Sequence, residues 1–538
     1  MDIRIDYDIL AWKKIIHERI PFYYAGNINS VVTIVDKYYG KNIEEISHSI
    51  GCTINNLTGN FSSILDFGDI IIAFTDRVRS YPVFYKIDSG EVAVSNSIYN
   101  LGGSDFDEIS VSEIRSTKYV TGKATLYKNI FQLQAGECLI YSKLTLDYSI
   151  IKYERYFSDQ VFDFNESRML ESLSSSVDSI FTRLVSDLNG REVWIPLSGG
   201  LDSRFILCKL LSYGYDRIKT FSYGPKGNHD AKWAKYVANK LSVPWEFINY
   251  SRKSSYNFFW SEKRKEYWKM ASNGCTVPFM ADEQAMHYLT EKYSATDYSD
   301  IVVINGQSGD FISGDHVCGN HLLELDPYKT YDSEIVVNAI ILKHYGLNKG
   351  LNINNQDWIE GKIIDTIGLK PGRYTGELIA KYYELWEMSE RQSKHVVNGQ
   401  RSYDYYGIDW FLPLWEKEMV DFWKKVPYKY KINQNLYKKY LRSNNWFGLF
   451  DGFNPSVWQW QGVGMANIPI AKIIELVSGQ NTKNKYYELA GYFGRYSHNY
   501  APFGLMKHIR DIDIYGKNPW GRYADQLLLE LKKGKNDD

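Results

Sequence analysis

The chain has few cysteines, no long hydrophobic run and no surplus of charge of either sign. Its 538 residues include five cysteines, and 63 basic residues stand against 64 acidic ones. The cysteines are scattered without metal-ligand spacing, which argues against a zinc-finger or disulfide-scaffold protein and suits a reducing compartment. They are Cys52, Cys138, Cys208, Cys275 and Cys318. We therefore expect a cytoplasmic protein.

The balanced charge and the lack of apolar runs exclude further classes of protein. A dedicated nucleic-acid binder usually carries a strong basic surplus, whereas the formal net charge here is −1. No apolar run approaches the roughly 18 residues that a membrane helix needs. Residues 1–6 lack the pattern of a signal peptide. The sequence thus predicts a globular protein of two or more domains, with no nucleic-acid partner and no membrane span.

The first part of the chain has the pattern of short strands and turns. An apolar run over 70–74 predicts a buried strand, and the runs 83–87 and 91–95 flank an Asp-Ser-Gly turn, as in a hairpin. A further turn and strand are predicted over 134–141. These patterns indicate an antiparallel, sheet-rich domain over residues 1–160.

The pattern then changes to alternating helices and strands, which predicts a doubly wound parallel sheet in a domain over 161–538. Ligands of such sheets bind at the carboxyl ends of the strands. The last part of this domain, from about residue 330, has mostly helical patterns. The predicted elements are helices over 165–188, 204–211 and 230–241, and strands over 193–197, 218–224, 245–248 and 301–306.

Residues 197–204, Leu-Ser-Gly-Gly-Leu-Asp-Ser-Arg, follow directly on a predicted buried strand. The glycines let the backbone approach a ligand closely, and the N–H groups of the loop and helix start favour an anion. Asp202 would repel a phosphate unless a divalent cation lies between them. This stretch resembles the pyrophosphate loop of the N-type ATP pyrophosphatases, which cleave ATP between the α and β phosphates. A plain glycine turn is the alternative.

Further motifs extend the resemblance to the asparagine synthetase superfamily, which includes β-lactam synthetases and lasso-peptide cyclases. Residues 76–85 resemble the family's Asp-Arg-x-Gly-x-x-Pro-Leu-Tyr-Tyr stretch, and 125–136 its segment leading into Pro-Gly. Residues 221–224 resemble its adenine-binding strand, 305–314 its Ser-Gly-Glu-Gly-Ser-Asp-Glu loop, and 412–415 its Val-Pro-Phe-Leu-Asp turn. The resemblance implies an α/β protein: an N-terminal Ntn-like antiparallel α+β sandwich domain, then a doubly wound parallel-sheet PP-loop ATP pyrophosphatase domain with a helical C-terminal part.

The first departure from the family lies at the N-terminus. A class II glutaminase needs cysteine directly after the initiator methionine, where the freed α-amine acts as base. Here that position is Asp2, the next cysteine is Cys52, and the family's Asn-Gly-Glu motif for glutamine is missing. We expect the domain over 1–160 to be a retained scaffold without glutaminase activity. A rewired site around Cys52 is the alternative.

The second departure lies in the synthetase loop. The family's glutamate is Gln307 here, and an amide can orient a substrate but cannot take a proton. The family's late catalytic lysine is also missing, because the corresponding region, 457–462, reads Val-Trp-Gln-Trp-Gln-Gly. The Trp458–Trp460 pair can stack on a sugar or belong to the core. ATP activation is still expected, since the pyrophosphate loop, Asp202 and Asp310 are present.

The resemblance and the strand-end positions together give the candidate site. Asp202 and Asp310 can hold one Mg²⁺ that bridges the phosphates of ATP; for Asp310 a helix N-cap is the alternative. The candidate catalytic residues are Asp202, Gln307, Asp310 and His316. The candidate ATP and pyrophosphate ligands are Leu197, Ser198, Gly199, Gly200, Asp202, Ser203, Arg204, Phe221, Ser222, Tyr223, Asn305 and Gly306.

The expected function is an ATP-dependent, AMP-forming amide ligase that joins a carboxylate to ammonia or a primary amine. A narrower resemblance, to the asparagine-synthetase-related proteins of bacterial surface-polysaccharide clusters, implies a hexuronic acid of a surface glycan as substrate. The stretches that carry it are 197–204, 306–310 and 391–394, the last leading to 406–407 and 412–414. A macrocyclising or β-lactam-synthetase-like ligase and a degenerate nucleotide-binding homologue stay as alternatives. The balanced charge disfavours a tRNA-modifying pyrophosphatase, and a homodimer is compatible with the family.

Overall fold

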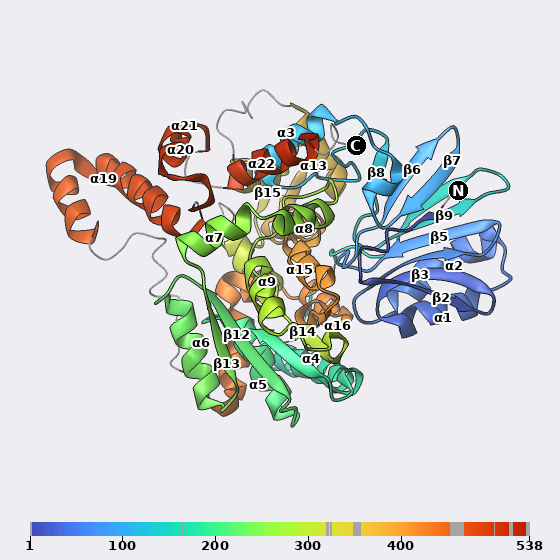
Figure 1. Ribbon diagram of the computed structural model, residues 1–538, viewed down its shortest axis with the longest axis horizontal. Coiled ribbons are helices and arrows are strands. Elements are labelled where there is room, and N and C mark those ends of the chain that lie inside the picture. The colour runs from blue at the N-terminus through green and yellow to red at the C-terminus, as the bar shows by residue number, and fades with distance from the viewer. Residues whose placement is uncertain are drawn as a thin grey trace.

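The computed structural model describes residues 3–158, 160–163, 165–318, 322, 325–347, 357–451, 467–499, 501–515 and 520–533. Figure 1 shows its layout, with two N-terminal sheets at one end, a parallel sheet below the centre, and several helices of the last third above it. The protein is therefore a mixed α/β protein with an antiparallel part followed by a parallel-sheet part, as the sequence predicts.

The larger N-terminal sheet is antiparallel and covered on both faces. Alternate residues point to opposite sides, so Ile72 and Phe74 pack under two helices, α1 (Ile28–Tyr38) and α2 (Ile43–Asn55), while Ile71 and Ala73 face the second sheet. In sheet order its six strands are β10 (Tyr148–Lys152), β9 (Glu137–Ser142), β5 (Ile70–Thr75), β4 (Phe61–Asp66), β3 (Ile20–Gly26) and β2 (Trp12–His17).

The second N-terminal sheet completes a sandwich with the first. Val92 and Val94 pack toward the larger sheet, whereas Phe84 and Ile130 pack on the other side, in a core that includes Ile114 of helix α3 (Glu108–Thr117). This arrangement is the predicted α+β sandwich, antiparallel except that the short strand β1 pairs in parallel with β7. In sheet order its four strands are β1 (Ile3–Arg4), β7 (Glu91–Ser95), β6 (Phe84–Asp88) and β8 (Ile130–Gln132).

The central sheet of the second part has five strands, all parallel. Successive strands are added first on one side of the first strand and then on its other side, so the strand order reverses at that point. The chain enters at β11, adds β12 and β13 on one side, and then places β14 and β17 on the other. Ligands of doubly wound sheets bind where the order reverses, outside the carboxyl ends of the two strands concerned. In sheet order the strands are β13 (Trp245–Asn249), β12 (Ile218–Gly224), β11 (Glu192–Pro196), β14 (Ile301–Ile304) and β17 (Asp409–Phe411).

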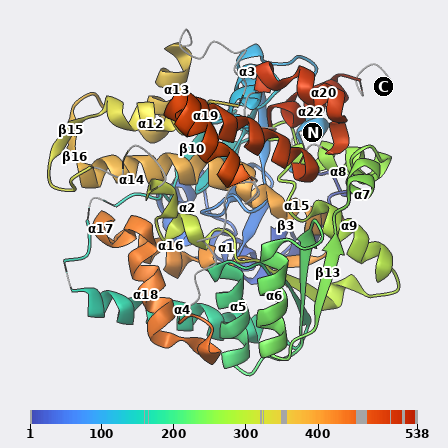
Figure 2. The same cartoon turned by 90° about the vertical axis from the view of Figure 1, so that its left-hand side faces the viewer.

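Helices surround this sheet and form most of the last third of the chain; Figure 2 shows α12, α13 and α14 lying together above it. Those along the sheet are α4 (Glu166–Leu188), α5 (Leu201–Ser212), α6 (His229–Lys240) and α9 (Glu283–Lys292). Two further helices, α7 (Arg252–Phe259) and α8 (Glu262–Ser272), pack in the core that includes α3 and the second N-terminal sheet. The later ones are α10 (Gly309–Ile312), α11 (Asp315–Cys318), α12 (Glu334–His344), α13 (Asp357–Ile367), α14 (Gly376–Glu387), α15 (Arg401–Tyr405), α16 (Lys417–Trp423), α17 (Tyr428–Lys431), α18 (Asn435–Asn444), α19 (Asn467–Asn499), α20 (Leu505–Arg510), α21 (Ile512–Tyr515) and α22 (Trp520–Lys533).

Two unusual segments sit among these helices. A π-helix, η4 (Met388–Val396), continues α14 and leads into the 3-10 helix η5 (Val397–Gln400). A two-stranded ribbon pairs β15 (Thr330–Asp332) with β16 (Arg373–Thr375). The other 3-10 segments within the described residues are η1 (Ile98–Leu101), η2 (Tyr298–Asp300), η6 (Pro413–Trp415), η7 (Ile432–Gln434), η8 (Trp446–Gly448) and η10 (Ala501–Phe503).

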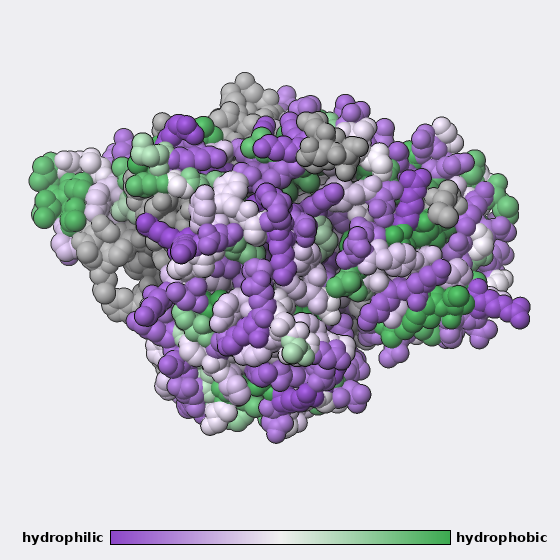
Figure 3. Space-filling view, in the orientation of Figure 1, coloured by the Kyte–Doolittle hydropathy of each residue, from purple (hydrophilic) through white to green (hydrophobic). Residues whose placement is uncertain are grey.

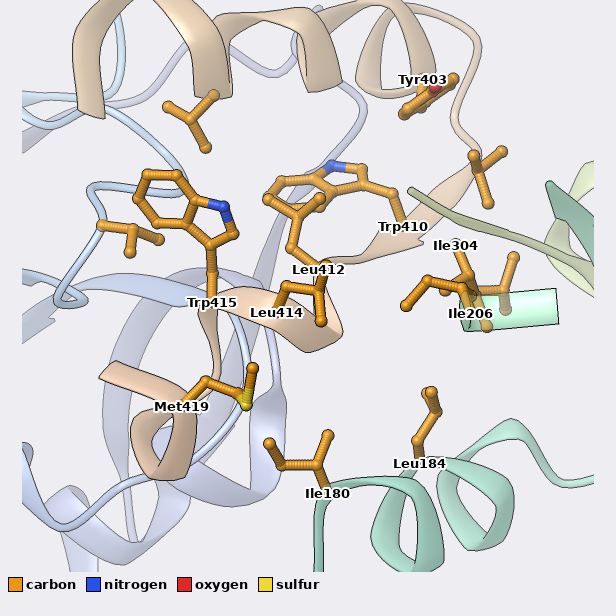
Figure 4. Close-up of a cluster of buried hydrophobic side chains, with 14 of the residues drawn as sticks. Ile180, Leu184, Ile206, Ile304, Tyr403, Trp410, Leu412, Leu414, Trp415 and Met419 are labelled. Carbon is orange, nitrogen blue, oxygen red and sulfur yellow. The ribbon is translucent and has the colours of Figure 1, made fainter. Parts of the chain in front are cut away.

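A buried apolar cluster supports the strand ends where the sheet order reverses (Figure 4). Ile304 ends β14, and Trp410, Leu412 and Leu414 follow through β17 and the turn after it. Because Leu184 and Ile206 close the cluster from α4 and α5, the loops above it stand on a packed, apolar base.

The predicted elements of both parts are present, with ends shifted by a few residues. The predicted helix over 204–211 begins at Leu201, and the strand over 301–306 ends at Ile304, where the chain turns into a loop. No helix in the described part of the chain combines the length and the apolar character that a bilayer span requires. The division at residue 160 stays a prediction, and residues 457–462 lie outside the described residues.

The face shown in Figure 3 is mainly hydrophilic. An apolar patch stands out at the outer end of α19, where Ile473, Leu476 and Val477 are 61%, 86% and 79% exposed. Three largely exposed apolar side chains close together on one helix are unusual on a monomer surface.

Candidate active site

Two loops meet at the strand ends where the sheet order reverses. Loop 198–203 follows β11 and loop 305–310 follows β14; they join where the Asp310 amide donates to Asp202 Oδ2 at 3.1 Å. A cavity of about 350 Å³ opens between them. It is lined by Pro196, Ser198, Gly200, Asp202, Ser203, Tyr223, Phe279, Ala281, Asp282, Asn305, Gly306, Gln307, Ser308, Asp310, His316, Arg391, Gln392 and Val396.

Glycines allow the two loops to come this close. A Cβ on Gly306 would lie 2.8 Å from the Ser203 amide nitrogen, and one on Gly309 would lie 2.5 Å from Asp202 Oδ1. Both distances are far inside van der Waals contact, so a side chain at either position would force the loops apart. Gly306 therefore lets the backbones of the two loops approach each other, and Gly309 leaves room for the Asp202 side chain.

Hydrogen bonds within loop 198–203 fix its shape. The Ser198 amide donates to Ser203 Oγ at 3.1 Å, and the Gly200 amide donates to Ser198 Oγ at 3.1 Å. Arg204 is fully buried behind the loop, where its guanidinium donates to the carbonyls of Gly199 and Leu449, each at 2.8 Å. Arg204 thus holds the loop from behind and does not line the cavity.

Asp202 is an acidic group without a basic partner among its hydrogen bonds in the described residues. Its Oδ1 accepts from the Tyr437 hydroxyl at 3.0 Å, and its Oδ2 from the Asp310 amide. Burial, and then the negative charge of Asp310, raise the pKa of Asp202 to about 7. Two neighbouring carboxylates of this kind fit a hard divalent cation that takes its other ligands from phosphate oxygens and water. No cluster of three or more metal-ligating side chains occurs in the described part of the chain.

Asp310 and His316 belong to a chain of charges that ends at Glu387. His316 Nε2 lies 3.2 Å from Asp310 Oδ2, and its Nδ1 lies 2.8 Å from Glu387 Oε1. Arg391 Nη1 donates to the same Glu387 oxygen at 2.7 Å. Burial opposes protonation of His316, but Glu387 and the hydrogen bond with Asp310 raise its pKa. Ser308, not Asp310, is the N-cap of α10.

Gln307 has its side-chain amide oriented by a second glutamine. Gln400, which is fully buried, donates from Nε2 to Gln307 Oε1 at 2.7 Å, and the Gln307 backbone amide donates to Asn305 Oδ1 at 3.0 Å. Because Gln307 Oε1 is occupied, the Nε2 group is left to donate. The wall of the cavity therefore offers a donor at this position, where a carboxylate would offer an acceptor.

The side of the cavity beside β12 is aromatic. Tyr223 stacks on Tyr250 with ring centroids 5.3 Å apart. The hydroxyls of Tyr223 and Tyr403 both donate to Asp282, a buried carboxylate that also receives Asn305 Nδ2 at 3.4 Å. This network fixes a flat ring at the edge of the cavity, suited to a planar ligand group.

The structure brings together many of the predicted residues and places a few elsewhere. Those that line the cavity are Ser198, Gly200, Asp202, Ser203, Tyr223, Asn305, Gly306, Gln307, Asp310 and His316. Those that lie behind it are Leu197, Gly199, Arg204, Phe221 and Ser222. Lining residues absent from the predicted site include Phe279, Asp282, Arg391 and Gln392. Sequence reasoning had no signal for Asp282, and Arg391 and Gln392 reach the site through a π-helix that periodicity does not reveal.

The position expected to hold a glutaminase nucleophile, Asp2, lies outside the described residues. Cys52 is exposed on α2, where its Sγ lies 4.0 Å from Asn56 Nδ2.

Comparison with known proteins gives one result that bears on this site. The sequence pattern of asparagine synthase matches residues 177–460, which is more than half of the chain and includes both loops of the cavity. No curated protein shows a significant match. The chain belongs to the asparagine synthase family of ATP-dependent ligases.

Proposed function

We propose that this protein activates a carboxylic acid with ATP, releases pyrophosphate, and transfers the acyl group from AMP to ammonia or a primary amine. The observation that carries the proposal is the meeting of loops 198–203 and 305–310 at one cavity, with Asp202 and Asp310 side by side. A loop whose N–H groups can bind phosphate lies next to two carboxylates that can hold a divalent cation. Together these two features suit the release of pyrophosphate better than either one alone.

ATP is proposed to lie with its adenine toward Tyr223 and its phosphates toward loop 198–203. Asp202 and Asp310 would hold Mg²⁺, which neutralises phosphate charge when bound. The raised pKa of Asp202 supports this placement of Mg²⁺. Burial and the negative charge of Asp310 disfavour the ionised carboxylate, and the positive charge of a bound cation would offset both effects. Arg204 and the serines of the loop keep its backbone fixed, so little reorganisation is needed when charge develops.

The reaction is proposed to run in two steps. A carboxylate oxygen of the substrate attacks the α-phosphorus, the bond to the β-phosphate oxygen breaks, and pyrophosphate leaves. The amine nitrogen then attacks the acyl carbon, AMP leaves, and the amine proton passes to water. Gln307 donates to the acyl oxygen and accepts no proton, while His316 keeps Asp310 oriented.

The finer substrate assignment rests on the sequence resemblance to proteins of surface-polysaccharide clusters. We propose a hexuronic acid as the carboxylate substrate, and ammonia or an amine taken from solution as the nitrogen donor.

The test is to follow the products of ATP with Mg²⁺, ammonium and a panel of uronic acids. We expect equal amounts of AMP and pyrophosphate. Asp202→Ala should lower the rate by about 100- to 1,000-fold, the size seen when a main electrostatic stabiliser is removed. Asp216→Ala, at an exposed aspartate of the same sheet region, is the matched control and should keep full activity. ADP and orthophosphate as products would contradict the proposal.

A further inference from the structure

Arg391 has one side of its guanidinium bound by the protein and the other side open. It lies on η4 in the wall of the active-site cavity, and its side chain is 26% exposed. Nη1 donates to Glu387 Oε1 at 2.7 Å and lies 3.1 Å from His316 Nδ1. Nε and Nη2 make no hydrogen bond within the described residues, and neither is sealed from solvent. Both nitrogens are therefore left to a ligand of the cavity.

Glu387 fixes the bound side of this guanidinium without neutralising it fully. The carboxylate is fully buried, and basic side chains contact both of its oxygens. Its Oε1 contacts Arg391 and His316, each within 2.8 Å. Its Oε2 lies 2.9 Å from His344 Nε2 and 3.3 Å from Lys343 Nζ. One carboxylate is thus shared by four basic groups, so the arginine is held in place and keeps positive charge for a further anion.

The position of Arg391 along the cavity wall separates it from the proposed metal ligands. The His316 ring stands between Asp310 and Arg391, with Nε2 3.2 Å from Asp310 Oδ2 and Nδ1 3.1 Å from Arg391 Nη1. Arg391 therefore lies one imidazole ring further along the wall than Asp310. Phosphates held by a cation at Asp310 are closer to that end of the wall than the open side of the arginine is.

The neighbouring contacts lead from Arg391 toward the acyl end of the cavity. Gln392, the next residue on η4, accepts from the Ser308 hydroxyl at 2.9 Å. Ser308 directly follows Gln307, the residue assigned to the acyl oxygen, and all of these residues line the same cavity. An anion on the open side of Arg391 is thus expected between the phosphates and the acyl group.

We propose that Arg391 binds the carboxylate of the acyl substrate through Nε and Nη2 and holds it beside the α-phosphate of ATP. This inference rests on the proposed function, because it takes the acid to occupy this cavity. The two nitrogens present parallel N–H donors that match the two oxygens of a carboxylate. An amide lacks that charge and one acceptor, so Arg391 distinguishes the acid from the amide that ligation with ammonia produces.

Labelling of arginines by phenylglyoxal, read by peptide mass spectrometry without ATP, tests this contact directly. Glucuronate and acetate carry the carboxylate, whereas glucuronamide and acetamide have nearly the same shape without the charge. Pyrophosphate is the probe for a phosphate ligand. The control is Arg217, which precedes β12 at the opposite end of the sheet and pairs with Asp300 with 51% of its side chain exposed.

We expect saturating glucuronate to slow labelling of Arg391 by about tenfold, as for a charge-assisted hydrogen bond, and acetate to slow it less. The amides and pyrophosphate should leave it unchanged, and Arg217 should react equally throughout. Protection by acetate but not glucuronate would support the carboxylate site and reject a hexuronic acid as the substrate. No protection by either acid, equal protection by the amides, or stronger protection by pyrophosphate would overturn the proposal.

Arg391→Lys separates substrate binding from support of the site. The lysine ammonium can still pair with Glu387 but offers no second pair of donors to a ligand. Calorimetric affinity for glucuronate should fall about tenfold, whereas affinity for ATP with Mg²⁺ should stay unchanged. Arg217→Lys should change neither affinity. Equal losses for both ligands, or no loss, would overturn the proposal. Neither readout needs turnover, so failure of the carboxylate site and absence of pyrophosphate release are separate results.

Discussion

At the residue scale, Gln307 decides what the cavity can do with a proton. Gln400 fixes its amide through the 2.7 Å hydrogen bond to Oε1, so the group that is left is a donor. A donor at this place stabilises negative charge on an acyl oxygen but takes no proton from an amine. In the proposed reaction the amine must therefore arrive unprotonated.

Removing the Gln307 amide should weaken the reaction without abolishing it. Gln307→Ala should lower kcat/KM for the carboxylate by roughly 1–3 kcal/mol of transition-state stabilisation, the cost of a lost hydrogen bond in a buried site. The KM for ATP should change little, because no ATP phosphate is assigned to this residue. Steady-state kinetics with each substrate varied in turn give both numbers.

Restoring the family's acid should not help. Gln307→Glu places a negative charge beside the substrate carboxylate and the phosphates, so we expect a rate no higher than that of the unaltered protein. The measurement is the initial rate of pyrophosphate release at saturating ammonium. A Gln307→Glu enzyme several times faster would contradict this. It would mean that the protein still uses the family's route for proton transfer and lacks only the glutamate.

At the scale of elements, the site depends on two loops that approach more closely than side chains would permit. Gly309→Ala would place a Cβ 2.5 Å from Asp202 Oδ1 and push α10 away from loop 198–203. We expect a loss of at least about tenfold in pyrophosphate release, with the fold retained, because misplacing a phosphate ligand by about 1 Å carries such a cost.

Gly361→Ala is the matched control for Gly309→Ala. Gly361 lies within α13, and a Cβ there would meet no atom within 4 Å. Since alanine is the better helix former, this variant should keep full activity and gain up to about 1 kcal/mol of stability. A Gly309→Ala enzyme as active as this control would show that the loops tolerate separation.

How much the sequence predicts also differs between elements. Buried parallel strands are short apolar runs, so β11, β12 and β14 can be recognised in the sequence. Glycine-rich loops follow β11 and β14, and they place Asp202 and Asp310 at the same edge of the sheet. Arg391 and Gln392 lie on a π-helix, whose period is neither 3.6 nor 2 residues. Their partner Glu387 is local, four residues before Arg391, whereas tertiary packing brings His316 near both of them. No local pattern encodes that contact.

At the scale of the whole molecule, a buried carboxyl links the N-terminal part to the later helices. Glu113 of α3 is fully buried; it receives Lys362 Nζ of α13 at 2.5 Å and the Tyr345 hydroxyl at 3.3 Å. Burial nevertheless raises the pKa of Glu113 to about 7, although Lys362 opposes the shift. The protonation state of one residue therefore affects how the two parts hold together.

This shift predicts a stability that falls as pH rises. Between the ordinary glutamate pKa of about 4.3 and the folded value near 7, the unfolded chain has lost the proton that the folded chain keeps. Stability is therefore full below pH 4 to 5, declines toward pH 7, and levels off above. The free energy of unfolding of Glu113→Gln should fall less between pH 5 and pH 7.5 than that of the unaltered protein, by on the order of 1–3 kcal/mol. Urea midpoints of both proteins at pH 5 and pH 7.5 give the comparison, and parallel declines would contradict it.

The source of nitrogen is also a property of the whole molecule, because a glutaminase and a ligase must work together to use glutamine. Asp2 offers no thiol nucleophile, and Cys52 lies exposed on α2. Glutamine should therefore be a poor donor and yield no glutamate, whereas ammonium should support ligation at a rate that rises with pH as the fraction of free amine grows. Cys52→Ser should change neither result. The assay is glutamate and amide product measured together, from pH 7 to 9. Stoichiometric glutamate formed from glutamine, and lost in Cys52→Ser, would show that the N-terminal part has built a glutaminase around a cysteine in the middle of its fold.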